Sequence, residues 1–99
     1  MIVRVLTMPV KPERFDDWLR YTRDIGFPGM RAQPGCRGIW RLHKADGGFD
    51  YQVATVWDGR EELERFKASE AMRELSAQAA GLTTPPYREE IFDLVPDPE

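Results

Sequence analysis

Hydrophobic and polar residues change their spacing along the chain, and each change marks a boundary between expected elements. Residues 1–8 are rich in Val, Ile and Leu and end at Pro9, which predicts a β-strand. From Pro12 onward, apolar residues recur every three or four positions, which predicts an amphipathic helix with the proline in its first turn. The apolar positions of this helix are Phe15, Trp18, Leu19, Thr22 and Ile25.

Glycines and prolines end this first helix and open a hairpin. Their density between Gly26 and Gly35 predicts that the helix stops between Ile25 and Ala32 and that residues 33–35 form a loop. Residues 36–44 and 49–57 are rich in β-branched and aromatic side chains and flank a turn-like segment, which predicts two strands of a hairpin. The turn segment is Ala45, Asp46, Gly47 and Gly48.

A second helix and a last strand complete the pattern. Asp58 is placed to cap a helix that Gly81 ends, and Leu63, Phe66, Met72, Leu75 and Ala79 would form its apolar stripe. Residues 87–95 return to strand composition, and 96–99 are a polar tail. The order βαββαβ predicts one ferredoxin-like α+β domain over 1–95, with a four-stranded antiparallel sheet and both helices on one face.

Both faces of this sheet are expected to be buried. In the first strand, Ile2 and Leu6 point to one side and Val3 and Val5 to the other, so both sides are apolar. Two helices cover one face only, and a second copy of the chain is the simplest cover for the other. The alternative is that loops 26–35 or 81–86 fold under the sheet within one chain.

Composition and charge exclude several classes of protein. The chain is 41% hydrophobic and 31% charged, with a formal charge of -3 and no basic stripe, which argues for a globular protein and against nucleic-acid binding. No apolar run approaches the roughly 20 residues that span a membrane, so we expect no membrane contact and a cytoplasmic location. One cysteine, Cys36, and one histidine cannot by themselves build a structural zinc site.

The residues themselves resemble a known family. Its likeness rests on the βαββαβ order, the run Pro34-Gly35-Cys36-Arg37-Gly38, and Thr55-Val56-Trp57 at the end of the third strand. With Phe66, Ser69 and Met72 on the second helix, the chain resembles the antibiotic biosynthesis monooxygenase domain over roughly residues 1–95. This resemblance implies a dimeric α/β barrel, in which two sheets pack face to face.

The family contains cofactor-free oxygenases of aromatic polyketides, quinol oxygenases, haem-degrading enzymes and members without an assigned role, and its fold does not choose among them. The haem-degrading branch uses an Asn on the first strand and a Trp and a His on the second helix. The matching positions here are Thr7, Phe66 and Ser76, which disfavours haem degradation. We therefore predict a cofactor-independent monooxygenase of a small electron-rich aromatic or quinol, without bound metal. The alternative is a non-catalytic dimeric module that binds a small hydrophobic ligand or serves a stress role.

Two residues are the candidates for contact with the reacting atoms. Histidine is the side-chain type best suited to proton abstraction near neutrality, and His43 is the one histidine of the chain, although an exposed hairpin-end histidine is the plainer interpretation. Trp57 resembles the strand-end tryptophan of the family, and its indole could stack on a planar substrate or simply pack in the core.

Further residues are expected to line a substrate pocket between the sheet and the helices. The resemblance places Thr7, Phe66, Met72 and Ser76 there, although core packing also explains the apolar two. Arg41 shares strand parity with His43, although a salt bridge would equally explain it. Tyr51 could line the cavity mouth or pair across the hairpin with Trp40.

Overall fold

The computed structural model describes residues 1–46 and 50–96 as four strands and two helical segments. The strands are β1 (Ile2–Pro9), β2 (Cys36–His43), β3 (Asp50–Trp57) and β4 (Arg88–Asp93). Between β1 and β2 the chain forms η1 (Pro12–Arg14), α1 (Phe15–Tyr21), η2 (Thr22–Gly26) and α2 (Phe27–Arg31). Between β3 and β4 it forms α3 (Arg60–Lys67) and α4 (Glu70–Ala79).

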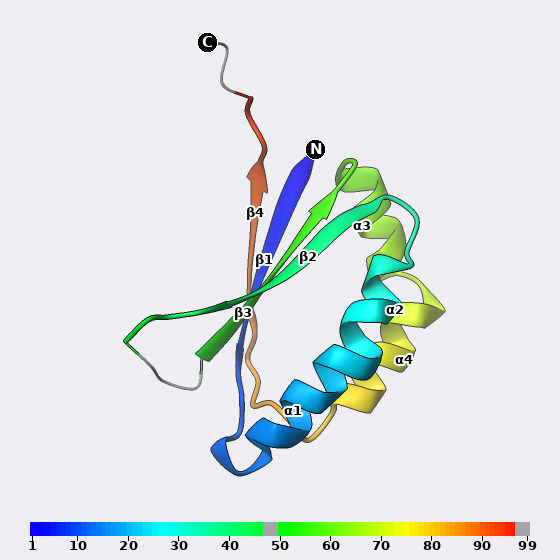
Figure 1. The fold of residues 1–99 in the computed structure, drawn as a ribbon. Helices are drawn as coiled ribbons and strands as arrows, with labels where there is room; N and C mark the ends of the chain where they lie inside the picture. The colour runs from blue at the N-terminus through cyan, green and yellow to red at the C-terminus, as the bar shows by residue number, and fades with distance from the viewer. Residues whose placement is uncertain (47–49, 97–99) are drawn as a thin grey trace.

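The predicted ferredoxin-like fold is confirmed. The strands are ordered β2-β3-β1-β4, and each neighbouring pair is antiparallel. All the helices lie on one face of the sheet, and no described helix lies on the other (Figure 1). The hairpin of β2 and β3 is also confirmed, while part of its predicted turn, residues 47–49, lies outside the described ranges.

The first helical segment is less regular than its spacing predicts. Its turns pass from 3-10 to α to π and back to α geometry between Pro12 and Arg31. The wider π turn over Thr22–Gly26 shifts the helical phase, because each residue there advances the chain by a smaller angle. As a result Thr22 and Gly26 are buried, whereas Ile25, expected on the apolar stripe, is exposed.

The single second helix that the pattern predicted is two helices. The first of them, α3, ends at Lys67. Ser69 caps α4 by accepting a hydrogen bond from the Met72 backbone N–H at 3.2 Å. The prediction that Asp58 caps the N-terminus of α3 is wrong. Gly59 holds the capping position of α3, and the Asp58 carboxylate instead accepts bonds from the Arg37 guanidinium.

The register of the strands decides which side chains face the helices. The pairs Ile2↔Trp57, Arg4↔Thr55 and Met8↔Tyr51 point toward the helical layer, which we call the covered face. Val3, Val5 and Thr7 alternate with them and therefore point to the opposite, open face. The expected Trp40–Tyr51 pairing is wrong, because Trp40 lies opposite Ala54 and Tyr51 lies opposite His43.

Two clusters of buried side chains pack between the covered face and the helices. One contains Val10, Trp18, Ile39, Tyr51, Val53 and Leu82. The other contains Ile2, Trp57, Leu63 and Phe66 near α3. Met30 of α2 packs against both clusters, so the core is continuous on this side of the sheet.

Within residues 1–46 and 50–96, the open face has no such cover. Trp40 is 54% exposed and Phe92 is 49% exposed, and Leu42 is exposed beside them on the same face. The alternative that loops 26–35 or 81–86 cover this face is wrong, because Gly26, Met30 and Thr83 all line a cavity on the helical side.

Candidate functional site

A cavity of about 280 Å³ separates the covered face from the helical layer. The strands contribute Leu6, Met8 and Val53 to its wall, and the first helical segment contributes Trp18, Phe27 and Met30. Helices α3 and α4 complete the wall with Phe66, Met72, Leu75 and Ala79. The wall is therefore mostly apolar and rich in aromatic rings, which is the usual lining of a small-molecule site.

One charged side chain interrupts this apolar wall. Arg4 occupies the centre of β1 on the covered face and is 7% exposed. Its Nε donates a hydrogen bond to Glu89 Oε2 of β4 at 2.6 Å, and Lys67 Nζ of α3 donates to the other oxygen, Oε1, at 3.1 Å. Burial opposes ionisation of Glu89, but the bonds from Lys67 and Arg4 outweigh it and lower the pKa of the carboxyl group.

The hydroxyl groups in the wall mostly have partners in the protein. Tyr21 donates to the Leu75 backbone carbonyl at 2.7 Å, which ties α1 to α4 across the cavity, and burial raises the pKa of its phenol. Thr55 accepts a hydrogen bond from Trp57 Nε1 at 2.9 Å. Thr83 and Tyr87 share a hydrogen bond of 2.5 Å.

The π turn in the first helical segment also shapes the wall. Thr22 and Gly26, its first and last residues, both line the cavity. A Cβ at Gly26 would lie 3.1 Å from Cε1 of the Tyr21 ring, so a larger residue would push that ring. Single π turns are often found at functional sites, and this one sets the positions of two lining residues.

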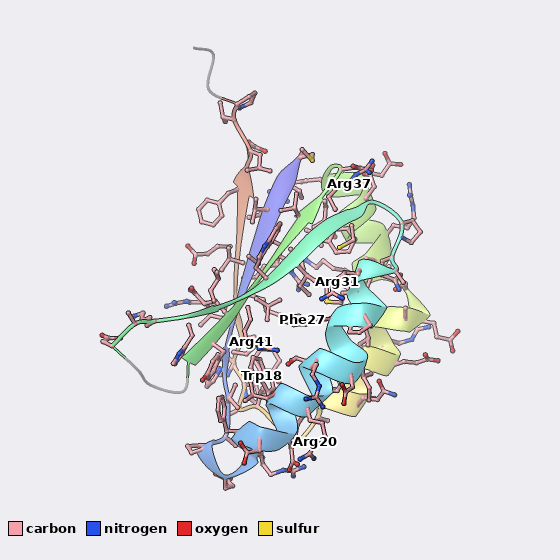
Figure 2. The ribbon with its side chains drawn as sticks, in the orientation of Figure 1. Trp18, Arg20, Phe27, Arg31, Arg37 and Arg41 are labelled. Atoms are coloured by element: carbon pink, nitrogen blue, oxygen red, sulfur yellow. The ribbon has the colours of Figure 1, made fainter. Side chains whose placement is uncertain are left out.

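Arg41 supports the wall from outside the cavity. Its side chain reaches from β2 across to the first helical segment, where Nη2 donates to Thr22 Oγ1 at 2.8 Å (Figure 2). The guanidinium carbon lies 5.5 Å from the ring centre of Trp18 and 5.2 Å from that of Phe27. Arg41 thus holds two lining aromatic rings in place without being part of the wall itself.

Three of the predicted pocket residues come together in the wall. Phe66, Met72 and Ser76 all line the cavity from α3 and α4. Thr7 does not, because it points to the open face, where its Oγ1 accepts a hydrogen bond from Gln52 Nε2. Tyr51 is buried in the core cluster beside the cavity and stacks on Phe15 and His43.

The two predicted catalytic residues lie outside the cavity wall. The imidazole of His43 stacks on the Tyr51 ring at 4.4 Å between centres, on the exposed edge strand β2. Trp57 is 0% exposed, and its indole stacks on Phe66 at 5.2 Å. A direct role for either residue in a reaction stays a prediction, but Trp57 contacts two residues that do line the cavity, Phe66 and Thr55.

The family model for "Antibiotic biosynthesis monooxygenase" matches residues 1–78 of this chain. The chain belongs to the antibiotic biosynthesis monooxygenase family. The resemblance noted from the sequence is therefore confirmed, although no curated protein matches the chain.

Several solved structures share this fold. Rv0793 of Mycobacterium tuberculosis is 21% identical, with a TM-score of 0.73 and full coverage of both chains, 100% and 100%. SnoaB, a cofactor-independent oxygenase of Streptomyces nogalater, is 20% identical in a mutant form, with a TM-score of 0.74 over 99% of this chain and 97% of its own. A further antibiotic biosynthesis monooxygenase is 20% identical, with a TM-score of 0.79 over 97% and 100% of the two chains. At such identities the likeness shows the fold alone.

Within this family fold, sequence reasoning missed the most polar part of the cavity. Arg4 was passed over as one residue of an apolar strand, although its parity with Ile2 and Leu6 places a charge where a core residue belongs. Glu89 and Glu90 are adjacent acidic residues in the sequence, yet Glu89 faces Arg4 while its neighbour points to the open face. Tyr21 gave no signal, because its hydroxyl bond to Leu75 joins residues far apart in sequence.

Across residues 1–46 and 50–96, no group of three His, Cys, Asp or Glu side chains is arranged to hold a metal ion. In that same part of the chain, no helix has the length and apolar character needed to cross a membrane.

Proposed function

We propose that this chain is a cofactor-independent monooxygenase that acts on a small electron-rich aromatic or quinol in the cavity between sheet and helices. The observation that carries the proposal is the aromatic and apolar cavity of about 280 Å³ in a chain of this family. Its volume lies near the lower end of ligand sites, which suits a small planar ring system. The fold shared with a cofactor-independent oxygenase is consistent with this activity.

Such a reaction asks little of the protein. An anthrone, for example, has a ring methylene that dioxygen converts to a carbonyl, and the second oxygen atom leaves as water, so the substrate supplies all the electrons. The protein must hold the substrate in a dry pocket and stabilise its ionised form. In this proposal Phe66 and Met72 contact the ring, and Trp57 positions Phe66 by stacking on it.

Oxygen uptake tests the proposal. An oxygen electrode would compare a panel of anthrones and quinols for wild type, Ala79→Leu and Ala77→Leu. Ala79 lines the cavity, whereas Ala77 is exposed on the same helix, so the two changes match in size and helix propensity. We expect uptake by wild type and Ala77→Leu, and a loss of at least about tenfold in Ala79→Leu because the added side chain misplaces the substrate.

The predicted base is tested in the same assay. His43→Ala should lower the rate if His43 accepts a proton and should leave it unchanged if the imidazole only stacks on Tyr51. Absence of uptake with every substrate in wild type would reject the oxygenase.

One observation favours the non-catalytic alternative. His43 is the one histidine of the chain, and it is not part of the cavity wall. A dimeric module that binds a small hydrophobic ligand would need no base, and it would bind aromatic compounds without consuming oxygen.

We also propose that two copies of the chain pair through their open faces. Trp40, Leu42 and Phe92 supply exposed apolar surface there, and Val3, Val5 and Val56 lie between them on the same face. Apolar surface of this extent on one face is typical of an interface between subunits. The mass in solution tests this pairing, as described below.

A further inference from the structure

The strongest unexplained feature of the cavity is a buried cation in an apolar wall. In the described part of the chain, Arg4 is the one charged residue that lines the cavity. Removing a guanidinium from water is costly unless its N–H groups find partners. The hydrogen bonds of Arg4 therefore have to be counted one donor at a time.

Arg4 uses only part of its bonding capacity within the protein. A guanidinium has five N–H donors, and the Nε–H of Arg4 donates to Glu89 Oε2 at 2.6 Å. Neither of its Nη atoms donates a hydrogen bond to residues 1–46 or 50–96. Neither Nη atom is among the fully buried side-chain atoms that lack a partner. The four Nη hydrogens therefore lack hydrogen-bond partners among the described residues, in a side chain that lines the cavity.

The neighbouring carboxylate has little left to offer Arg4. The second oxygen of Glu89 accepts the bond from Lys67 Nζ, so one carboxylate serves two cations. Glu64 lies 3.8 Å from Lys67 but is mostly exposed, so solvent screens its charge. Among the described residues, Lys67 therefore has two carboxylates as partners, whereas Arg4 contacts Glu89 alone and shares it with Lys67.

The other polar groups in the wall compete weakly with Arg4 for a ligand. The Tyr21 hydroxyl is occupied by the Leu75 carbonyl, and Thr55 already accepts from Trp57. An N–H of an arginine that meets an anionic oxygen in an apolar cavity forms a short charge-assisted hydrogen bond, stronger than one between neutral groups.

We propose that Arg4 selects aromatic anions: its Nη groups bind an ionised oxygen, phenolate, enolate or carboxylate, at the edge of a planar ring that fills the cavity. This inference rests on the proposed function, because it concerns the ligand of the same cavity. Glu89 and Lys67 are positioning residues, which hold the guanidinium by its Nε side and leave the Nη side to the ligand.

A pair of probes of equal shape tests the inference without any turnover. Binding of 2-naphthoate and 2-naphthamide would be measured by calorimetry at pH 7, where the first carries a charged oxygen and the second does not. We expect wild type to bind the naphthoate at least about tenfold more tightly, the difference that one charge-assisted hydrogen bond provides. The preference should shrink to within about twofold in Arg4→Gln and persist in part in Arg4→Lys.

Arg37→Gln is the matched control, because Arg37 is exposed, pairs with Asp58 and is not part of the cavity wall. It should keep the full preference of wild type. Circular dichroism establishes that each variant is folded. If Arg4→Gln does not fold, the wild-type probe pair and Arg4→Lys still decide the question.

The outcomes separate the two proposals. Equal affinity for both probes in wild type, no binding of either, or a preference that survives Arg4→Gln would overturn the role of Arg4. Oxygen uptake with neutral quinols together with any of these results would leave the oxygenase standing. A clear preference for the naphthoate without oxygen uptake would leave Arg4 as an anion-selecting residue in a binding module.

Discussion

The two faces of the sheet are both apolar in sequence, but they have different surroundings. On the covered face, Ile2, Val53 and Trp57 are buried against helices within one chain. On the open face, Trp40 and Phe92 remain about half exposed. The covered face also carries polar residues that a plain core would lack, Arg4 and Thr55, and these lie where the cavity is.

This difference teaches how to interpret an alternating strand. An apolar residue on the face away from the helices indicates a surface that needs a second molecule. A polar residue on the face toward the helices indicates space that a ligand could fill, because a closed core would leave its charge without partners. β1 carries both signals in adjacent positions, Val3 and Arg4.

A charge on the open face should have the largest effect. Val3 lies between Val56 and Phe92, so Val3→Asp would bury a carboxylate without a partner in the proposed interface. We expect the mass measured by light scattering to fall from twice 11.5 kDa to 11.5 kDa, with an unchanged circular dichroism spectrum.

Val95→Asp is the control, because Val95 is exposed beyond β4 and should keep the mass of wild type. A wild-type species of 11.5 kDa at micromolar concentration would contradict the proposed dimer. So would a Val3→Asp variant that retains the double mass.

The two strand tryptophans offer the next comparison, one on each face. In the monomeric Val3→Asp background, Trp57→Phe should lower the free energy of unfolding by about 2 kcal/mol, because it shrinks a fully buried side chain and removes the Nε1–H donor to Thr55. Trp40→Phe should change it by less than about 0.5 kcal/mol, since Trp40 lies on the open face. Urea unfolding measures both, and equal effects would contradict the distinction between the faces.

The sequence predicts where the strands and helices lie better than it predicts which face of the sheet each residue points to. Strand composition and helical spacing depend on nearby residues, and they located β1, the hairpin strands and β4 within one or two residues. Because both parities of β1 are apolar, composition alone could not tell which face meets the helices. The family resemblance placed Thr7 in the pocket, whereas Arg4 and Leu6 line it.

The candidate site was predicted only where a helix presents it. Phe66 and Met72 belong to the apolar stripe of the second predicted helix, and both line the cavity. The Arg4–Glu89 pair joins residues at opposite ends of the chain, and only the pairing of β1 with β4 brings them together. The π turn at Thr22 likewise depends on packing that local spacing does not encode.

Glu89 and Glu90 extend the comparison to charge, because these neighbours point to opposite faces. Glu89→Gln should lower the free energy of unfolding by about 1–2 kcal/mol at pH 7, since the buried Arg4 loses its charged partner. Glu90→Gln should change it by less than about 0.5 kcal/mol.

The pH dependence of this difference has a definite sign. The folded pKa of Glu89 is lowered, so its contribution is complete above the unfolded value, about 4.3, and is lost as the pH falls through the folded value. Urea unfolding from pH 7 to pH 2.5 should show wild type and Glu89→Gln converging below about pH 4. A difference that stays constant over this range would contradict the ion pair.

The smallest expected effect concerns α4, one of the helices that cover one face of the sheet. Ser69→Ala removes the cap of α4 and should lower the free energy of unfolding by about 1 kcal/mol. Ser76→Ala is the control, because the Ser76 hydroxyl makes only a long contact with Met72 Sδ at 3.8 Å, and the change should stay below about 0.5 kcal/mol. Hydrogen exchange should speed up in α4 and leave β1 and β3 unchanged, because the helix covers the cavity while the sheet is held by its own ladders. The mass in solution should remain that of wild type. Faster exchange across the whole sheet would contradict this prediction, because it would mean that α4 and the covered face unfold as one unit.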